Sequence, residues 1–165
     1  MNQQLRQDAD RIIADAIHAV LPDQAVIRAL EAASFPGRIR LVAAGKAAWQ
    51  MAQAASKTLG DSLECGVICT KYGHCGGKLP KITCCEGGHP IPDENSLRAT
   101  DAELSLVQGL TAQDTVLFLL SGGGSALFEK PLIPLHELQD ITQQLLASGA
   151  SIVAINAIRK RLSAV

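Results

Sequence analysis

The chain has 165 residues, of which 47% are hydrophobic and only 3% aromatic, and its formal charge at pH 7 is −1. This length and apolar content suffice for one buried core and exclude a disordered chain. The charge, from 15 basic and 16 acidic side chains, offers no broad electrostatic surface for nucleic acid or an anionic membrane. We therefore expect a small-molecule ligand, with neither nucleic acid nor membrane as a partner.

The N-terminal segment has the pattern of two helices. Apolar residues from Leu5 to Val20 recur at helical spacing, which predicts an amphipathic helix that ends before Pro22. Asp23 is expected to cap a second helix that runs to about Ala33. Charged residues interrupt the first helix, and no apolar run reaches the roughly 20 residues of a membrane span. The expected location is therefore cytoplasmic.

Three apolar runs follow, each typical of a buried strand. The run "RIRLVAAG" predicts a strand from Arg38 to Ala44, and "AAWQMAQAASKTL" predicts the helix after it. The runs "CGVICT" and "KITCCEGG" predict two more strands, with the turn-rich loop "KYGHCGGKLP" between them. Since about ten residues are few for a parallel crossover, these two strands are expected to be antiparallel or not adjacent.

The remaining elements complete an alternating pattern. Asp93 or Asn95 can cap a helix that runs to about Gln108, and the apolar run from Val116 to Leu120 predicts a fourth strand. Pro134 then opens another helix, and Ser151 caps a last one that continues to the chain end. Strands that alternate with helices predict an α/β fold with a largely parallel sheet and helices on both faces.

The cysteines are expected to be structural. Their number is odd, and they lack the paired CxxC spacing of a zinc site. We interpret them as reduced, mostly buried apolar residues, with an exposed loop position at one of them, and expect no metal site. They are Cys65, Cys69, Cys75 (the loop position), Cys84 and Cys85.

The segment after the fourth strand is the strongest candidate for a binding loop. Ser121, Gly122, Gly123, Gly124 and Ser125 follow the strand directly, and ligands of open α/β sheets bind beyond the carboxyl ends of the strands. Such a loop can aim successive N–H groups at a phosphate or carboxylate beside a helix N-terminus. The alternative is a tight turn without a ligand, because the loop matches neither GxGxxG nor GxxxxGK[ST].

Polar residues of the other loops after strands are further candidates. Lys46 lies between a strand and a helix, where its ammonium group can neutralise a transferring phosphoryl group or simply be solvated. Lys71, His74 and His89 lie in loops and are either acid–base and hydrogen-bonding groups or plain surface residues. Asp93 is either a ligand contact or a helix N-cap.

A pair on the last helix is the final candidate. Asn156 and Arg159 are three residues apart and so share a helix face. An arginine beside an amide can hold a carboxylate in bidentate fashion, and the alternative is a solvated basic face.

Five segments in order resemble the glycerate 2-kinase family that carries a C-terminal MOFRL domain. They are "LVAAGKAAWQMAQAA", "GVICTKYGH", "EGGHPIPDENSLRAT", "LFLLSGGGSALFEKP" and "LLASGASIVAINAIRKRLSAV". The resemblance implies that residues 1–165 are the N-terminal part of that family's Rossmann-like domain, incomplete relative to the family and without the MOFRL domain.

The resemblance also implies an activity: ATP-dependent phosphorylation of D-glycerate to 2-phosphoglycerate, with Mg²⁺. It makes Lys46 the catalytic residue and the loop of residues 121–125 the cradle for the ATP phosphates. It implies that a further set of side chains binds the substrate, namely Lys71, His74, His89, Asp93, Asn156 and Arg159.

The fragment alone is expected to be inactive, since the second domain is missing. Two alternatives to kinase activity remain. A hydroxypyruvate reductase is one alternative, although the chain lacks the dinucleotide fingerprint and its acidic ribose partner. The other is a non-catalytic binding or assembly fragment that forms a homo-oligomer through uncovered apolar surface.

Overall fold

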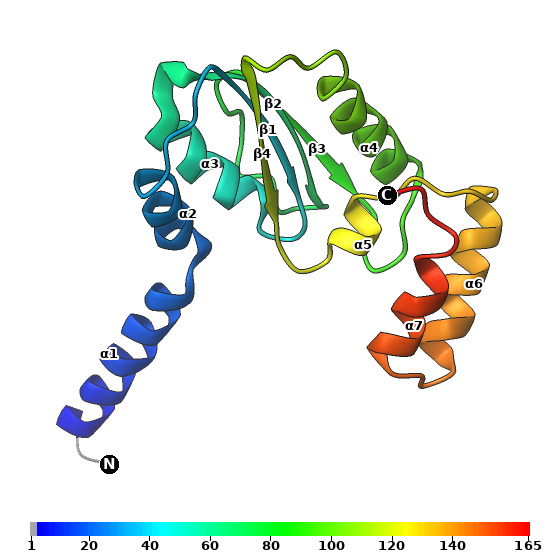
Figure 1. The fold of residues 1–165 in the computed structure, drawn as a ribbon. Helices are drawn as coiled ribbons and strands as arrows, with labels where there is room; N and C mark the ends of the chain where they lie inside the picture. Colours follow the sequence, from blue (N-terminus) through cyan, green and yellow to red (C-terminus); the bar gives the residue numbers. More distant parts are fainter. Residues whose placement is uncertain (1–2) are drawn as a thin grey trace.

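The computed structural model describes residues 3–165 and shows a four-stranded, all-parallel sheet between helices (Figure 1). The strands lie in the order β3, β2, β1, β4. Their bounds are β1 Arg38–Ala44, β2 Leu63–Lys71, β3 Ile82–Gly87 and β4 Asp114–Leu120. The helices are α1 Gln3–Val20, α2 Pro22–Glu31, α3 Ala48–Leu59, α4 Glu94–Leu106, α5 Gly124–Leu127, α6 Leu135–Ala147 and α7 Ile152–Arg159, with a 3₁₀ turn at Gly60–Ser62. The predicted α/β class is confirmed.

The pairing of β2 with β3 differs from the expectation. The two strands are adjacent and parallel, although only residues 72–81 connect them. This connection contains no helix. Instead it lies against Trp49, whose indole N–H donates a hydrogen bond of 2.8 Å to the carbonyl of Gly77. A Cβ on Gly76 would lie 2.6 Å from the same indole ring. A glycine-rich loop packed on one aromatic ring thus replaces the helix of an ordinary crossover.

The main core lies between the sheet and the helices α2 and α3. Ala48, Ala52 and Ala55 are fully buried and lie on one face of α3 because of their helical spacing. Their small side chains let the helix axis approach the sheet closely. The apolar residues of β1 that complete this cluster are Ile39, Leu41 and Ala43.

The opposite face of the sheet is only partly covered. Helix α4 packs on β2 and β3, where Cys69 and Ala99 are buried, so the predicted helices on both faces are confirmed. The β4 end of that face stays open: Val116, Phe118 and Leu120 are 38%, 45% and 59% exposed. This apolar strip lies at the edge strand of the sheet.

A buried carboxyl group on α4 makes stability depend on pH. Glu103 is 1% exposed, and neither of its oxygens has a hydrogen-bond partner among residues 3–165. Burial raises the pKa of Glu103 to about 9, and the nearby main chain of Cys69 offsets only part of this.

We expect Glu103→Gln to stabilise the chain above neutral pH. At a pH between the pKa of Glu103 in the unfolded chain and its raised pKa in the folded chain, Glu103 is protonated only in the folded state. The free energy of unfolding should therefore fall with rising pH, by up to about 1.4 kcal/mol per pH unit. The variant should lose this slope in urea titrations from pH 5 to pH 8. If the variant keeps the same dependence of unfolding free energy on pH, Glu103 is not protonated in the fold.

Two predicted helix ends are wrong. Asp23 lies inside α2, whose N-cap is Leu21 without any side-chain cap bond, since Pro22 starts the helix. Ser151 does cap α7, by accepting a hydrogen bond of 3.3 Å from an amide of its first turn. However, α7 ends at Arg159 and not at the chain end, because the following residues turn back to form a bridge with Pro131.

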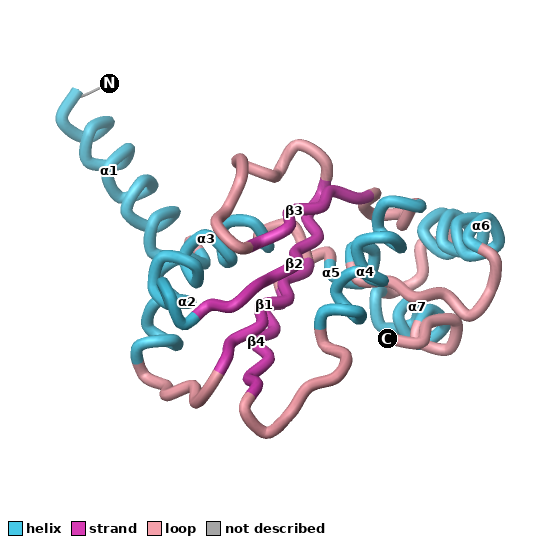
Figure 2. The backbone as a smooth tube through the Cα atoms, turned by 90° about the horizontal axis from the view of Figure 1, so that it is seen from above, coloured by secondary structure: helices cyan, strands magenta, loops and turns pink. Residues whose placement is uncertain are grey.

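The first and the last helices extend to opposite ends of the molecule. Figures 1 and 2 show α1 reaching away from the sheet at one end, and α6 beside α7 at the other. The predicted first helix is confirmed, but none of its residues is buried. Its exposed apolar residues are Leu5, Ile12, Ile13, Ile17 and Val20. Among the helices described within residues 3–165, none is long and apolar enough to cross a membrane.

The cysteines are less buried than predicted. All of them are free thiols, but only Cys69, on an inner strand, is buried. Cys84 and Cys85 are half-buried because β3 is an edge strand, and Cys75 in the loop is half-buried where exposure was expected.

Candidate functional site

The loops after β1 and β4 meet at the carboxyl edge of the sheet. The amide of Lys46 donates to the carbonyl of Gly122 over 2.9 Å, and the amide of Ala47 donates to the hydroxyl oxygen of Ser121 over 3.0 Å. The amide of Gly45 donates to the carbonyl of Cys69 at the end of β2. The predicted convergence of these loops is present, and hydrogen bonds hold them in register.

The bend after β4 leaves its amides uncommitted. Within the described part of the chain, the N–H groups of Gly122, Gly123 and Gly124 donate to no other group. Gly123 has φ +95°, a backbone conformation that residues other than glycine rarely adopt. The expected helix N-terminus contributes little, because α5 has only four residues and so a small dipole. The free amides themselves are the anion-binding feature of the bend.

The side chain of Lys46 runs along this bend. A Cβ on Gly123 would lie 3.2 Å from Lys46 Cγ, and one on Gly122 would lie 3.9 Å from Cε. The ammonium group makes no ion pair or hydrogen bond with any residue from 3 to 165. The carbonyl of Lys46 accepts from Thr70 Oγ1 (3.3 Å) and from His74 Nδ1 (3.1 Å). Hydrogen bonds thus fix the backbone of Lys46, whereas its ammonium group has no charged partner among residues 3–165.

His89 closes the other side of the bend. A Cβ on Gly123 would lie 2.9 Å from the Nε2 and Cδ2 atoms of the His89 ring. Burial lowers the pKa of His89, and the positive charges of Lys46, Lys71, Arg159 and His74 lower it further, in that order. Burial and the nearby lysine and arginine charges therefore disfavour the protonated form of this ring.

Asp93 acts as a helix cap. One carboxyl oxygen accepts from the amide of Ser96 over 2.9 Å and so forms a capping box at the start of α4. The other accepts from the Tyr72 hydroxyl over 2.6 Å, and Asn95 donates to the same hydroxyl. Burial alone would raise the pKa of Asp93, but the hydrogen bonds from Tyr72 and Ser96 lower it overall. The structure thus shows the capping role; substrate contact stays a prediction.

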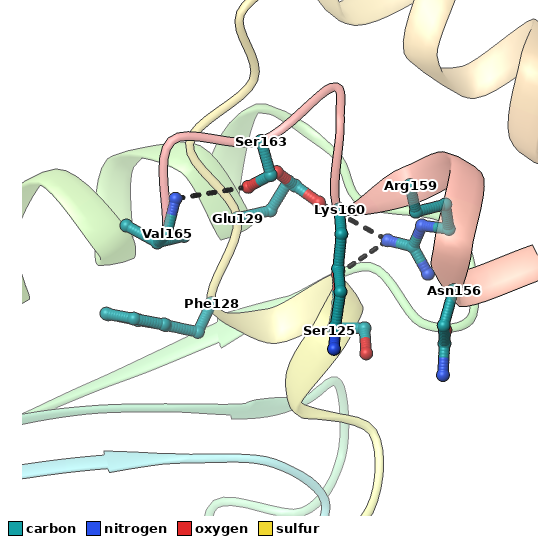
Figure 3. A pocket seen from close by; sticks show the side chains of 8 residues that line it. All are labelled: Ser125, Phe128, Glu129, Asn156, Arg159, Lys160, Ser163 and Val165. Carbon is teal, nitrogen blue, oxygen red and sulfur yellow. Dashed lines mark hydrogen bonds and ion pairs between the residues drawn. The ribbon is translucent and has the colours of Figure 1, made fainter. Parts of the chain in front are cut away.

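Asn156 and Arg159 line a pocket of about 170 Å³ next to the bend (Figure 3). Arg159 donates to the carbonyl of Ser125 and lies 3.4 Å from a carboxyl oxygen of Glu129. Ser125 belongs both to this pocket and to the hollow around the glycines. The predicted shared face of α7 is therefore turned to the loop after β4.

Comparisons with known proteins show the family of this chain. Residues 8–165 match the family model described as a domain of unknown function, DUF4147. The D-glycerate 2-kinase of Thermotoga maritima is 50% identical over 165 residues, which are 99% of this chain and 39% of that protein. The chain belongs to the glycerate 2-kinase family and corresponds to its DUF4147 domain.

Other relatives extend the comparison. A glycerate 2-kinase of Pyrococcus horikoshii is 40% identical over 98% of this chain and 39% of that protein. A putative hydroxypyruvate reductase of Agrobacterium vitis is 39% identical over 97% of this chain and 36% of that protein. The chain thus spans less than two fifths of the length of these relatives.

A solved structure confirms the fold. The crystal structure of the glycerate kinase from Thermotoga maritima superposes with a TM-score of 0.89 at 50% identity, over 98% of this chain and 39% of that one. The parallel sheet and its helices therefore match the corresponding part of that glycerate kinase.

Sequence reasoning missed two side chains of this region. Glu129 pairs with Arg159, and Tyr72 holds Asp93, but neither was selected as a candidate. A signal existed for Glu129, since it is a single carboxylate in the apolar stretch "ALFEKPL". Tyr72 carried no such signal, because an exposed loop tyrosine is ordinary.

Proposed function

We propose that this chain supplies the phosphate-binding part of a D-glycerate 2-kinase site, where the γ-phosphoryl group of ATP passes to the 2-hydroxyl of D-glycerate. One observation carries the proposal: the uncommitted amides of Gly122, Gly123 and Gly124 lie beside the free ammonium group of Lys46. Names of relatives at 50% and 40% identity support the choice of substrate.

The proposed roles follow from the demands of phosphoryl transfer. The reaction needs positioning and charge stabilisation more than covalent help from the protein. The amides of the bend and the hydroxyl groups of Ser121 and Ser125 bind phosphate oxygens, and Lys46 stabilises the charge of the transferring group. Lys71, His74, His89, Asp93, Asn156 and Arg159 line the substrate side.

Mg²⁺ fits this site only as a companion of the nucleotide. Among residues 3–165 no cluster of three His, Cys, Asp or Glu side chains could hold a metal ion. The side chains of Lys46, Lys71 and Arg159 act on His89 beside the bend, and none of them is a metal ligand. Mg²⁺ is commonly held by phosphates and water, with few protein ligands, and it supplies charge neutralisation there.

A hybrid enzyme tests the proposal. This chain would replace the matching segment of the Thermotoga maritima D-glycerate 2-kinase, with which it shares 50% identity. We expect ATP-dependent conversion of D-glycerate to 2-phosphoglycerate, identified by ³¹P NMR. A folded hybrid that oxidises NADH with hydroxypyruvate and ignores ATP would instead support the reductase alternative.

The open apolar strip of β4 favours assembly as a second role for the isolated chain. Val116, Phe118 and Leu120 are exposed there, and exposed apolar patches mark interaction surfaces. Size-exclusion chromatography with light scattering, with and without ATP–Mg²⁺, separates the two roles. A monomer that binds nucleotide supports the role as part of a kinase site, whereas an oligomer that does not bind nucleotide supports the assembly role.

A further inference from the structure

The ion pair beside the glycine bend is buried but incomplete. Glu129 and Arg159 have side chains that are 4% and 11% exposed, and their charged groups approach within 3.4 Å. Glu129 Oε1 and Arg159 Nε are both buried without a hydrogen-bond partner in the described chain. Buried charged groups normally have all their hydrogen bonds satisfied, since an unmet donor or acceptor is costly. One acceptor and one donor of this pair therefore have no partner in the described chain, and because both atoms are buried, a ligand reaches them only when the two side chains turn toward the pocket.

Both unmet atoms belong to residues of one small pocket. Its volume of about 170 Å³ is below the roughly 300 Å³ at which pockets for drug-sized ligands begin. Figure 3 shows the Arg159 guanidinium group above Asn156, with dashed lines from it toward Glu129 and Ser125. The pocket thus has room for a small polar molecule.

Glu129 is fixed from behind by a buried hydrogen-bond chain. Its amide donates to Thr100 Oγ1 over 2.9 Å, and the Thr100 hydroxyl donates to the carbonyl of Ser96 over 3.0 Å. Ser96 belongs to the capping box of Asp93. Glu129 is therefore held in place relative to the His89 loop as well as to the glycine bend.

We propose that Glu129 is a further substrate-binding residue, which accepts a hydrogen bond from the hydroxyl of a short 2-hydroxy acid whose carboxylate binds Arg159. A guanidinium donor recognises the carboxylate, and an adjacent carboxylate acceptor recognises a hydroxyl. Because donor and acceptor belong to one ion pair, an acid with its hydroxyl on the carbon next to the carboxylate is the shortest acid that can meet both. The inference deepens the proposed function and rests on it for the identity of the acid.

The test compares two acids that differ only in the 2-hydroxyl group. D-Glycerate and 3-hydroxypropionate would be titrated into the 165-residue chain, with the side-chain Nε–H signal of Arg159 followed by NMR. We expect D-glycerate to bind about tenfold more tightly, which corresponds to one hydrogen bond to a charged acceptor. Equal affinity for the two acids, or no saturable binding of D-glycerate, would overturn the inference.

Variants separate recognition from mere support of the fold. Glu129→Ala should bring the affinity ratio to about one, and Glu129→Gln to about two, since a neutral amide oxygen is a weaker acceptor. The matched control is Glu137→Gln, an exposed glutamate of α6, which should keep the full ratio. A purely structural Glu129 would weaken both acids equally and leave the ratio intact. If Glu129→Ala does not fold, the nearly isosteric Glu129→Gln decides alone.

The same samples distinguish failure of the inference from failure of the proposed function. ATP–Mg²⁺ titrations report on the glycine bend independently of the pocket. Nucleotide binding with an affinity ratio of one refutes the role of Glu129 only. An intact ratio without nucleotide binding supports Glu129 as a hydroxy-acid ligand and refutes the kinase proposal.

Discussion

Replacing Lys46 with alanine is expected to lower the turnover of the hybrid kinase by at least about a hundredfold, the effect of losing one preorganised electrostatic donor. The lysine side chain lies along Gly122 and Gly123, and its ammonium group has no partner within residues 3–165. Its charge is therefore available to the phosphoryl group and serves no ion pair of the fold. The measurement is steady-state kcat with ATP–Mg²⁺ and D-glycerate.

Two controls sharpen this prediction. Lys57→Ala removes an exposed lysine from the last turn of α3 and should leave kcat unchanged. Thermal unfolding of the Lys46→Ala variant should match the parent, because no contact of the ammonium group is lost. Near-normal kcat in Lys46→Ala would remove this lysine from its proposed role.

Gly45→Ala is expected to destabilise the chain by about 2–5 kcal/mol, the sum of backbone strain and overpacking. Gly45 has φ +120°, and a Cβ there would lie 2.3 Å from Ser121 Oγ and 2.6 Å from the Ser121 carbonyl oxygen. Both contacts belong to the junction between the loops after β1 and β4. The change would therefore separate these loops as well as strain the turn.

The matched control is Gly109→Ala. Gly109 has φ +65°, but a Cβ there would have no heavy atom within 4 Å, so this variant isolates the backbone cost of about 1–2 kcal/mol. Urea unfolding of both variants gives the difference. If Gly45→Ala is no more destabilising than Gly109→Ala, the two loops are not in the close contact described above.

Local patterns predicted most of the fold. A continuous apolar run located β1 to the residue, because a strand buried in a parallel sheet needs no polar alternation, and the run from Val116 to Leu120 located most of β4. The pairing of β2 with β3 could not be predicted. It depends on Trp49 packing against Gly76, a contact between segments that no local pattern connects.

The candidate site was predictable as a set of loops but not as a set of contacts. Parallel strands bring Lys46 and the glycine bend to one edge, which follows from topology alone. The sequence does not show whether Asp93 caps α4, because several polar residues compete for that role. Nor does it show that Glu129 pairs with Arg159, which lies 30 residues further along the chain. The cap is a local contact that the sequence offered as one of two roles for Asp93, whereas the pair of Glu129 with Arg159 forms only in the folded chain.

The most direct test of the central claim is a ¹H–¹⁵N NMR titration of the chain with ATP–Mg²⁺. We predict saturable shifts of the amide signals of Gly122, Gly123 and Gly124, and no such shifts in the Lys46→Ala variant. Nucleotide binding that leaves these three amides unmoved would contradict that claim.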